Sequence, residues 1–274
     1  MKTSDLTKHF MLIGSPVTHS LSPILHNIFA AQFGIEITYK LQEATVNNYR
    51  AVIEKFISLG GSGINITAPL KMPVFQYLKH IDANAQLAKA VNTLIISDNN
   101  LVGYNTDGMG LMRDLKRRNI IITGKNTLIL GAGGAARGIL GSLLEQKPNN
   151  IVITNRDIFK AKQIVSEFKG LGNIQVIESQ DLHYVNADII INATSSIPDY
   201  LDKLSFANTL CYDLNYTPET TQFMKTALIN GALGAYNGLG MLVEQAAIAF
   251  TLWHKLCPNT QRARQMLKQQ VLRI

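Results

Sequence analysis

The stretch TLILGAGGAAR, residues 127–137, decides the fold of this chain of 274 residues. Its first four residues form an apolar run typical of a buried strand, and a helical pattern follows the glycines over residues 138–146. Gly131, Gly133 and Ala136 occupy the three small-residue positions of the pattern GxGxx(G/A). Between a strand and a helix, this pattern is typical of the dinucleotide-binding loop of a Rossmann-type sheet.

Each small residue of the loop has a physical task in that interpretation. Gly131 permits the tight turn, Gly133 lets a pyrophosphate approach the backbone, and Ala136 lets the helix pack closely on the strand. The helix N-terminus adds amide donors and positive potential. An ordinary tight turn is the plain alternative, but the strand, the helix and a second strand at 151–154 follow in the order that a dinucleotide site requires.

The end of that second strand indicates which dinucleotide binds. NAD enzymes commonly place an acidic residue there to bind the ribose 2′-hydroxyl. Here Asn155 and Arg156 follow the strand, and Lys160 comes one helical turn later. Two cations suit a 2′-phosphate, so the sequence favours NADP. Asp157 leaves NAD open, because its carboxylate can repel a phosphate or accept from an unmodified ribose.

Alternating elements around the loop predict an α/β chain of two domains. Apolar runs at 151–154, 174–177, 187–191 and 209–214 alternate with helical stretches, which indicates a parallel, doubly wound sheet. The first hundred residues mix strand and helix signals, including an apolar run at 10–13 and a helix over 24–33, without a nucleotide loop. We expect a substrate domain over 1–107, completed by helices within 238–274, and a Rossmann-type domain over 108–237.

Composition excludes several other classes of protein. Hydrophobic residues make up 46% and charged residues 16%, which is typical of a folded globular chain. The net charge of +7 is spread out except at 113–118 and 262–273, each expected to be a solvated helix face, so we expect no nucleic-acid partner. The uncharged segment within 226–243 is rich in glycine, and we expect no membrane span. Cys211 and Cys257 lack CxxC spacing and the histidines lack HxxxH spacing, which favours a reducing cytoplasm and no metal.

Polar motifs stand at the ends of the predicted elements, where binding sites are commonly built. They cover residues 14–27, 63–71, 90–93, 105–108 and 238–245. Taken singly, each has a plain explanation: Ser20 and Ser22 can cap a helix, and Asn65 can form a turn. Taken together they offer hydroxyls, amides, one Lys and one Asp, which suits a small molecule that bears hydroxyls and a carboxylate.

This ordered set of motifs closely resembles the shikimate dehydrogenase family from about residue 10 to residue 253. The shared motifs are SxSP at 20–23, NITAPLK at 65–71, NTDG at 105–108, GAGGAAR at 131–137, NR at 155–156, INATS at 191–195, YDLNY at 212–216 and GLGMLVEQ at 238–245. The resemblance implies reversible NADPH-dependent reduction of 3-dehydroshikimate to shikimate, in aromatic amino-acid biosynthesis, by a monomer or a homodimer.

The resemblance also implies a role for each site residue. Lys71 is expected to be the general acid in reduction and the base in the reverse direction, with Asp107 beside it. The substrate carboxylate is expected to bind Ser20, Ser22 and Tyr216, and the ring hydroxyls to bind Asn65, Thr67, Asn92, Asp107 and Gln245. The expected cofactor ligands are Gly131, Ala132, Gly133, Gly134 and Ala135 for the pyrophosphate, Asn155, Arg156 and Lys160 for the adenosine end, and Gly238 for the nicotinamide region.

Two alternatives stay open from the sequence. Asp157 stands where NADP-linked members often carry Thr, and Lys160 stands where Arg is common. Both departures concern cofactor choice, so a quinate/shikimate dehydrogenase that uses NAD is the nearest alternative enzyme. A Rossmann-fold binding protein without catalysis is the alternative of another class, and the presence of Lys71 and Asp107 argues against it.

Overall fold

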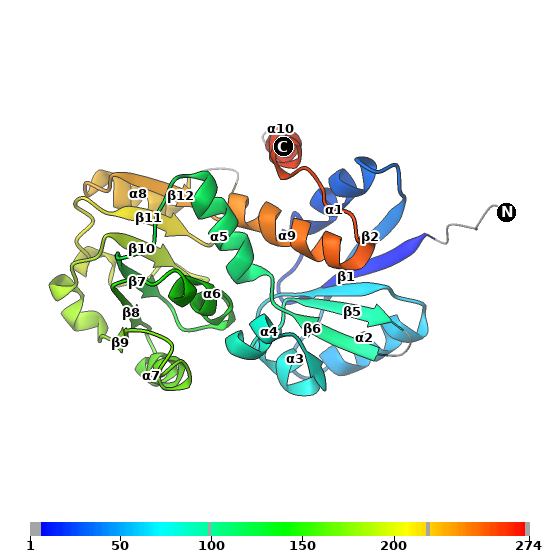
Figure 1. Ribbon diagram of the computed structural model, residues 1–274, viewed down its shortest axis with the longest axis horizontal. Coiled ribbons are helices and arrows are strands. Elements are labelled where there is room, and N and C mark those ends of the chain that lie inside the picture. The colour runs from blue at the N-terminus through cyan, green and yellow to red at the C-terminus, as the bar shows by residue number, and fades with distance from the viewer. Residues whose placement is uncertain (1–6, 98–99, 218–219, 272–274) are drawn as a thin grey trace. The chain divides into compact units, whose positions relative to one another are not determined.

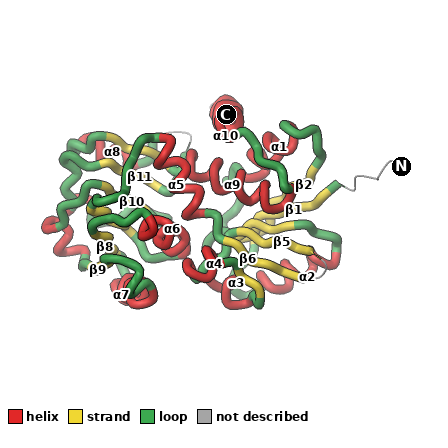
Figure 2. Tube along the Cα trace, viewed as in Figure 1, coloured by secondary structure: helices red, strands yellow, loops and turns green. Residues whose placement is uncertain are grey.

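The structure, a computed structural model, describes residues 7–97, 100–217 and 220–271 (Figure 1). It divides into two compact units, one formed by residues 1–107 with 243–274 and the other by residues 108–242. The chain returns to the first unit at Val243, inside a helix, whereas the sequence suggested a boundary at 238. In each unit the strands gather into one sheet with helices around it (Figure 2).

The first unit contains a six-stranded mixed sheet with the order β2-β1-β3-β5-β6-β4. Its strands are β1 (Lys8–Gly14), β2 (Ile37–Glu43), β3 (Gly63–Ile66), β4 (His80–Ile81), β5 (Thr93–Ser97) and β6 (Asn100–Tyr104). Its helices are α1 (Ser22–Ala31), α2 (Tyr49–Ser58), α3 (Lys71–Tyr77), α4 (Ala83–Ala88) and α10 (Thr260–Val271). Strand β3 pairs parallel with β1 but antiparallel with β5, so the sheet changes direction next to the motif that ends at Lys71.

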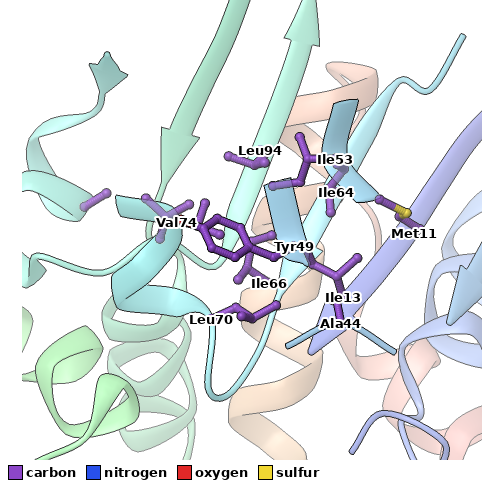
Figure 3. Close-up of a cluster of buried hydrophobic side chains, with 12 residues drawn as sticks. Met11, Ile13, Ala44, Tyr49, Ile53, Ile64, Ile66, Leu70, Val74 and Leu94 are labelled. Atoms are coloured by element: carbon purple, nitrogen blue, oxygen red, sulfur yellow. The ribbon is translucent and has the colours of Figure 1, made fainter. Parts of the chain in front are cut away.

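Strand β1 is buried on both faces of this sheet from Phe10 to Gly14. Alternate residues of a strand point to opposite faces, so its side chains enter two different cores. Met11 and Ile13 of β1 pack with residues of α2 and α3 in one apolar cluster (Figure 3). Phe10 and Leu12 of the same strand face a second cluster that contains Trp253 of helix α9 (Leu239–His254). Strand β1 therefore lies between two cores, and Ile64 and Ile66 of its neighbour β3 belong to the first of them.

The second unit contains a six-stranded parallel sheet with the order β12-β11-β10-β7-β8-β9. Its strands are β7 (Asn126–Leu130), β8 (Asn150–Thr154), β9 (Ile174–Val176), β10 (Ile189–Asn192), β11 (Leu210–Asp213) and β12 (Gly234–Asn237). Its helices are α5 (Asp107–Arg117), α6 (Gly134–Glu145), α7 (Ile158–Glu167) and α8 (Gln222–Ile229), with 3₁₀ turns η1 (Ser179–Tyr184) and η2 (Leu201–Lys203).

The strand order of this second sheet is that of a doubly wound Rossmann fold, so the predicted fold class is confirmed. The order reverses between β7 and β10, and ligands of such sheets bind at the carboxyl ends of the strands beside that reversal. The glycine-rich loop joins the carboxyl end of β7 to α6. The fold therefore presents this loop where a dinucleotide binds.

The basic stretch 113–118 is solvated as expected, but it also holds a buried carboxylate. Its exposed residues are Arg113, Lys116 and Arg117. Arg117 and Arg118 both bond the carboxylate of Asp114, which is completely buried. Tyr212 of β11 donates a hydrogen bond to the same carboxylate at 2.9 Å. Burial alone would raise the pKa of Asp114, but bonds from Arg118, Arg117 and Tyr212 hold it below its ordinary value. These arginines therefore neutralise a buried charge.

The second basic stretch, 262–273, extends beyond residue 271, the last that the structure describes. Within it, Arg264 pairs with the buried Glu244. Among the described residues, no helix combines the length and the apolar character that crossing a membrane requires.

Candidate active site

The first unit carries Lys71 and Asp107, and the second unit carries the glycine-rich loop. In the first unit, a short loop leads from β3 to Lys71, the first residue of α3. Asp107, the first residue of α5, comes directly after the NT of the NTDG motif. Lys71 Nζ lies 2.5 Å from Asp107 Oδ2, with the Lys71 side chain 15% exposed and the Asp107 side chain 6% exposed. This pair brings an ammonium group to a mostly buried position.

Asn92 orients the carboxylate of this pair. Its Nδ2 donates to Asp107 Oδ1 at 2.8 Å and to Thr106 Oγ1 at 2.9 Å. Its Oδ1 accepts the Thr106 backbone amide at 2.9 Å. Gln245 of α9 joins the group, with Oε1 at 3.4 Å from Asn92 Nδ2 and 3.3 Å from Thr106 Oγ1. Both Asp107 oxygens are thus engaged, one by Lys71 and one by Asn92, which fixes where the ammonium group lies.

Asn65 extends this polar cluster from the end of β3. Its Nδ2 donates to the Asn92 carbonyl at 3.2 Å and to Thr93 Oγ1 at 3.0 Å. Its Oδ1 accepts the hydroxyl of Tyr39 at 2.6 Å. Thr67 stands two residues further on, half-buried, with its amide bonded to the Ile13 carbonyl at 2.9 Å.

Ser20 and Ser22 form a separate pair at the start of α1. Ser20 Oγ lies 3.1 Å from Ser22 Oγ and accepts the Ser22 amide at 3.2 Å. The N-cap residue Leu21 makes no capping bond with its own side chain, but Ser20 Oγ accepts the amide of Ser22, the first residue of the helix. Tyr216, the third expected carboxylate ligand, belongs to the second unit.

The sequence did not single out Thr93, Thr106 or Tyr39, which the structure adds to the site. Thr93 lies in the polar motif at 90–93 and Thr106 in the motif at 105–108. Their positions next to Asn92 and Asp107 could have identified them as site residues. Tyr39 had no such signal. It lies in β2, and only the pairing of β2, β1 and β3 brings it to Asn65.

In the second unit, the glycine-rich loop leaves the backbone at the start of α6 open. Gly131 has φ +107°, and a Cβ there would lie 3.0 Å from the Ala193 carbonyl oxygen, so only glycine fits. Gly133 is the N-cap residue of α6, and nothing lies within 4 Å of the place where its Cβ would stand. An anion can therefore approach the backbone and the first amides of α6 without obstruction.

Asn155 supports that loop from the end of β8. Its Oδ1 accepts the Ala132 amide at 3.1 Å, and its Nδ2 donates to the Asp157 carbonyl at 2.8 Å. Arg156 and Lys160 are both exposed beside it. Asp157 is the N-cap residue of α7 and accepts the Phe159 amide at 3.1 Å. The Asp157 carboxylate, which left NAD open in the sequence, therefore caps helix α7.

Arg137, the last residue of the GAGGAAR motif, does not serve as a surface cation. It is 2% exposed and pairs with Glu167 of α7. The pair links α6 to α7 behind the loop. Arg156 and Lys160 are thus the basic residues that this part of the sequence offers to a phosphate.

Polar groups at the carboxyl ends of β10 and β11 complete this edge of the sheet. Asn192 and Asn215 both donate to Asp213 Oδ1, at 3.0 Å and 2.9 Å. Burial raises the pKa of the Asp213 carboxyl, against the effect of these hydrogen bonds. Gly238 follows β12, and a Cβ there would lie 2.2 Å from the Leu214 carbonyl oxygen, so the position admits no side chain. The backbone of this edge is held closely at the place assigned to the nicotinamide region.

Comparison with known families covers nearly the whole chain. The description "Shikimate dehydrogenase substrate binding domain" matches residues 12–94, "Shikimate / quinate 5-dehydrogenase" matches 114–211, and "Shikimate 5'-dehydrogenase C-terminal domain" matches 238–268. These three ranges contain most of the site residues described above.

Individual relatives agree with that assignment. The chain is 42% identical over 258 residues to "Shikimate dehydrogenase (NADP(+))" of Vesicomyosocius okutanii, covering 92% of this chain and 96% of the relative. It is 38% identical to the protein of the same name from Chromobacterium violaceum, covering 96% and 99%. A crystal structure of shikimate 5-dehydrogenase from Thermus thermophilus with NADP(H) and shikimate matches with a TM-score of 0.83 and 28% identity, covering 96% and 99%. The chain therefore belongs to the shikimate dehydrogenase family.

Proposed function

We propose that this protein is an NADP-dependent shikimate dehydrogenase, which reversibly reduces 3-dehydroshikimate to shikimate in the pathway to aromatic amino acids. The observation that carries the proposal is the buried Lys71–Asp107 pair, held by Asn92, in a chain of this family. A protein that only bound a dinucleotide would not need this ammonium group in a polar cluster.

The residues of the second unit fit NADPH, which supplies a hydride when bound. The unobstructed backbone at Gly133 and the amides of α6 suit its pyrophosphate. Arg156 and Lys160 suit a 2′-phosphate, because an exposed guanidinium and an exposed ammonium lie beside the loop. Asp157 accepts the Phe159 amide, and its Oδ2 lies 3.9 Å from Lys160 Nζ, so part of its charge is already engaged.

The chemistry assigned to Lys71 follows from the charge that develops on the substrate. When a ketone carbon gains a hydride, the carbonyl oxygen becomes an alkoxide and needs a proton. The Lys71 ammonium donates that proton and becomes an amine, and in the oxidation direction the amine takes the proton back. Asp107 does not transfer a proton in this scheme, but it holds Nζ in place at 2.5 Å.

The remaining polar residues of the first unit suit the other groups of the substrate. Asn65, Thr67, Asn92 and Gln245 offer amides and a hydroxyl near the Lys71–Asp107 pair, as the ring hydroxyls require. The serine pair offers two hydroxyls within 3.1 Å of each other, which suits the two oxygens of one carboxylate. We assign Tyr216 as the third carboxylate ligand by its position in the family motif.

A quinate-oxidising enzyme is the second candidate, because one matched family description names quinate beside shikimate. We favour shikimate, since every curated relative named above is a shikimate dehydrogenase. We also propose that the enzyme works in the cytoplasm, because both cysteines are free thiols, Cys211 buried and Cys257 exposed.

The reaction in the reductive direction tests this function. Purified protein is incubated with 3-dehydroshikimate and NADPH, and the product is identified by chromatography and mass spectrometry. We expect shikimate to form in step with NADPH loss. Consumption of NADPH without shikimate, or no consumption at all, would contradict the assignment.

A further inference from the structure

The imidazole of His26 lies in the core of the first unit and has no task in the site described so far. His26 stands in α1, four residues after Ser22, and is 1% exposed. Neither ring nitrogen has a hydrogen-bond partner among the described residues. Burial, with the charge of His254, lowers the pKa of His26 to about 3, although a polar contact with the Asn65 side chain opposes this shift, so His26 lies next to Asn65 as well as to Tyr39. A neutral polar ring is thus kept in an apolar core, which is unusual enough to require a reason.

The ring packs flat against one neighbour in particular. Its centroid lies 4.6 Å from that of Tyr39, with the two planes at 15°, a stacked arrangement. Trp253 lies at 5.1 Å and 39°, and Phe29 at 5.9 Å and 86°. Aromatic rings at these separations restrict one another. Tyr39 is 9% exposed, and its ring centroid also lies 6.5 Å from that of Trp253, so His26 and Trp253 both confine it.

Tyr39 in turn sets the orientation of Asn65. Its hydroxyl donates to Asn65 Oδ1 at 2.6 Å, while Asn65 Nδ2 donates to the Asn92 carbonyl and to Thr93 Oγ1. A carboxamide has two N–H donors and two oxygen lone pairs. Both donors of Asn65 and one lone pair are therefore engaged within the protein. What it has left for a ligand is an acceptor.

We propose that His26 is a positioning residue for substrate binding. Its flat ring holds Tyr39, and the Tyr39 hydroxyl locks the Asn65 carboxamide so that Oδ1 accepts a hydroxyl of the substrate. The inference rests on the proposed function and adds to it the direction of the hydrogen bond at Asn65 and the residues that impose it.

Three variants test the proposal through the kinetics of shikimate oxidation at saturating NADP. Tyr39→Phe removes the hydroxyl, and we expect KM for shikimate to rise about 3- to 10-fold, the scale of one hydrogen bond, with a smaller change in kcat. His26→Leu removes the flat ring and should raise KM in the same way. His26→Phe keeps a flat ring, and we expect KM close to that of the wild type.

His254→Leu is the matched control. His254 is a second imidazole in the same aromatic cluster, stacked on Phe250 at 4.3 Å, and its Nε2 is also buried without a partner. Its described ring contacts are with Phe10 and Phe250 and do not include Tyr39. A general loss of packing would affect both leucine variants alike. We expect His254→Leu to leave KM unchanged, whatever it does to the melting temperature.

The double variant His26→Leu/Tyr39→Phe shows whether His26 acts through Tyr39. If it does, KM of the double variant should equal that of Tyr39→Phe alone, because residues that share one interaction are not additive. Multiplied effects would overturn the proposal, as would an unchanged KM in Tyr39→Phe or a KM in His26→Phe as high as in His26→Leu. A wild-type protein that does not oxidise shikimate would contradict the proposed function first, and this inference with it.

Discussion

At the scale of single residues, the Lys71 ammonium is held by a carboxylate that is itself held from the other side. Asp107 engages Lys71 through Oδ2 and Asn92 through Oδ1. Such a network places a proton donor within narrow limits, and correct placement is most of what a general acid contributes. Two consequences at this scale can be measured, one at Lys71 and one at Arg156.

Lys71→Ala removes the proton donor. We expect kcat to fall by about 10²- to 10⁴-fold with a smaller change in KM for shikimate, the usual scale for a general acid–base group. Steady-state kinetics in both directions measure it, and Lys79→Ala, an exposed lysine in the same unit, is the control. Near-normal turnover in Lys71→Ala would remove this residue from the chemistry.

Arg156→Ala removes the cation nearest the end of β8. We expect NADP affinity to fall by about 1.5–3 kcal/mol, the scale of a charge-assisted hydrogen bond, while NAD affinity barely changes. Titration calorimetry with both dinucleotides measures the difference, and Arg113→Ala, another exposed arginine of this unit, serves as the control. Equal losses for NADP and NAD would mean that Arg156 does not contact the 2′-phosphate.

At the scale of elements, the start of α7 serves two purposes at once. It carries Lys160 toward the proposed 2′-phosphate site, and it depends on Asp157, whose carboxylate accepts the Phe159 amide. An acidic N-cap is favourable because it satisfies a free amide and complements the helix dipole. The same carboxylate in a NAD enzyme would face a ribose hydroxyl, so the structural task of Asp157 bears directly on cofactor choice.

Asp157→Ala should therefore destabilise the protein without weakening NADP binding. We expect a loss of about 1 kcal/mol in the free energy of unfolding, the usual cost of losing an N-cap. Asp157→Ser retains an N-cap acceptor and should recover most of the stability. Urea unfolding and NADP titration measure the two quantities, and weaker NADP binding in both variants would show that Asp157 contacts the cofactor.

Elements were predictable from the sequence where local signals agree. The loop at Gly131 is one such case, because strand, glycines and helix lie within a dozen residues. The helix expected over 24–33 is α1, Ser22–Ala31, which begins earlier because Pro23 suits the first turn of a helix. The pairing of Asp114 with Arg117 and Arg118 was not foreseen. Its burial depends on Tyr212, 98 residues away, and nothing in α5 itself indicates it.

At the scale of the whole molecule, contacts between distant parts of the chain were the least predictable. Gln245 reaches Asn92 across 153 residues, because α9 returns the chain to the first unit. The motif resemblance named both residues, but no periodicity or spacing in the sequence brings them together. The same return places Trp253 and His254 against β1, which builds the aromatic core around His26.

The aromatic core around His26 should lower the stability of the protein in mild acid. The pKa of His26 is lowered to about 3 in the folded state from 6.5, so below pH 6.5 the unfolded chain binds a proton that the folded chain excludes. The contribution of the neutral His26 ring to the free energy of unfolding is complete above pH 6.5 and is lost as the pH falls toward 3. The loss is about 2 kcal/mol between pH 7 and pH 5. In urea unfolding, the free energy of unfolding of His26→Phe should therefore fall by about 2 kcal/mol less than that of the wild type between pH 7 and pH 5. An identical pH dependence in both proteins would mean that His26 is not buried as a neutral ring.

The most direct test of the whole account is the initial rate of NADPH formation from shikimate and NADP by the purified protein, with quinate and NAD as the matched comparisons. We expect ready oxidation of shikimate with NADP, a much lower kcat/KM for quinate, and a much lower one for NAD. Quinate carries its carboxylate on a tetrahedral carbon, so the Ser20–Ser22 pair would lose a hydrogen bond and the additional hydroxyl would lack a partner. No NADPH from shikimate would contradict the central claim, and comparable kcat/KM values for shikimate and quinate would contradict the assigned specificity.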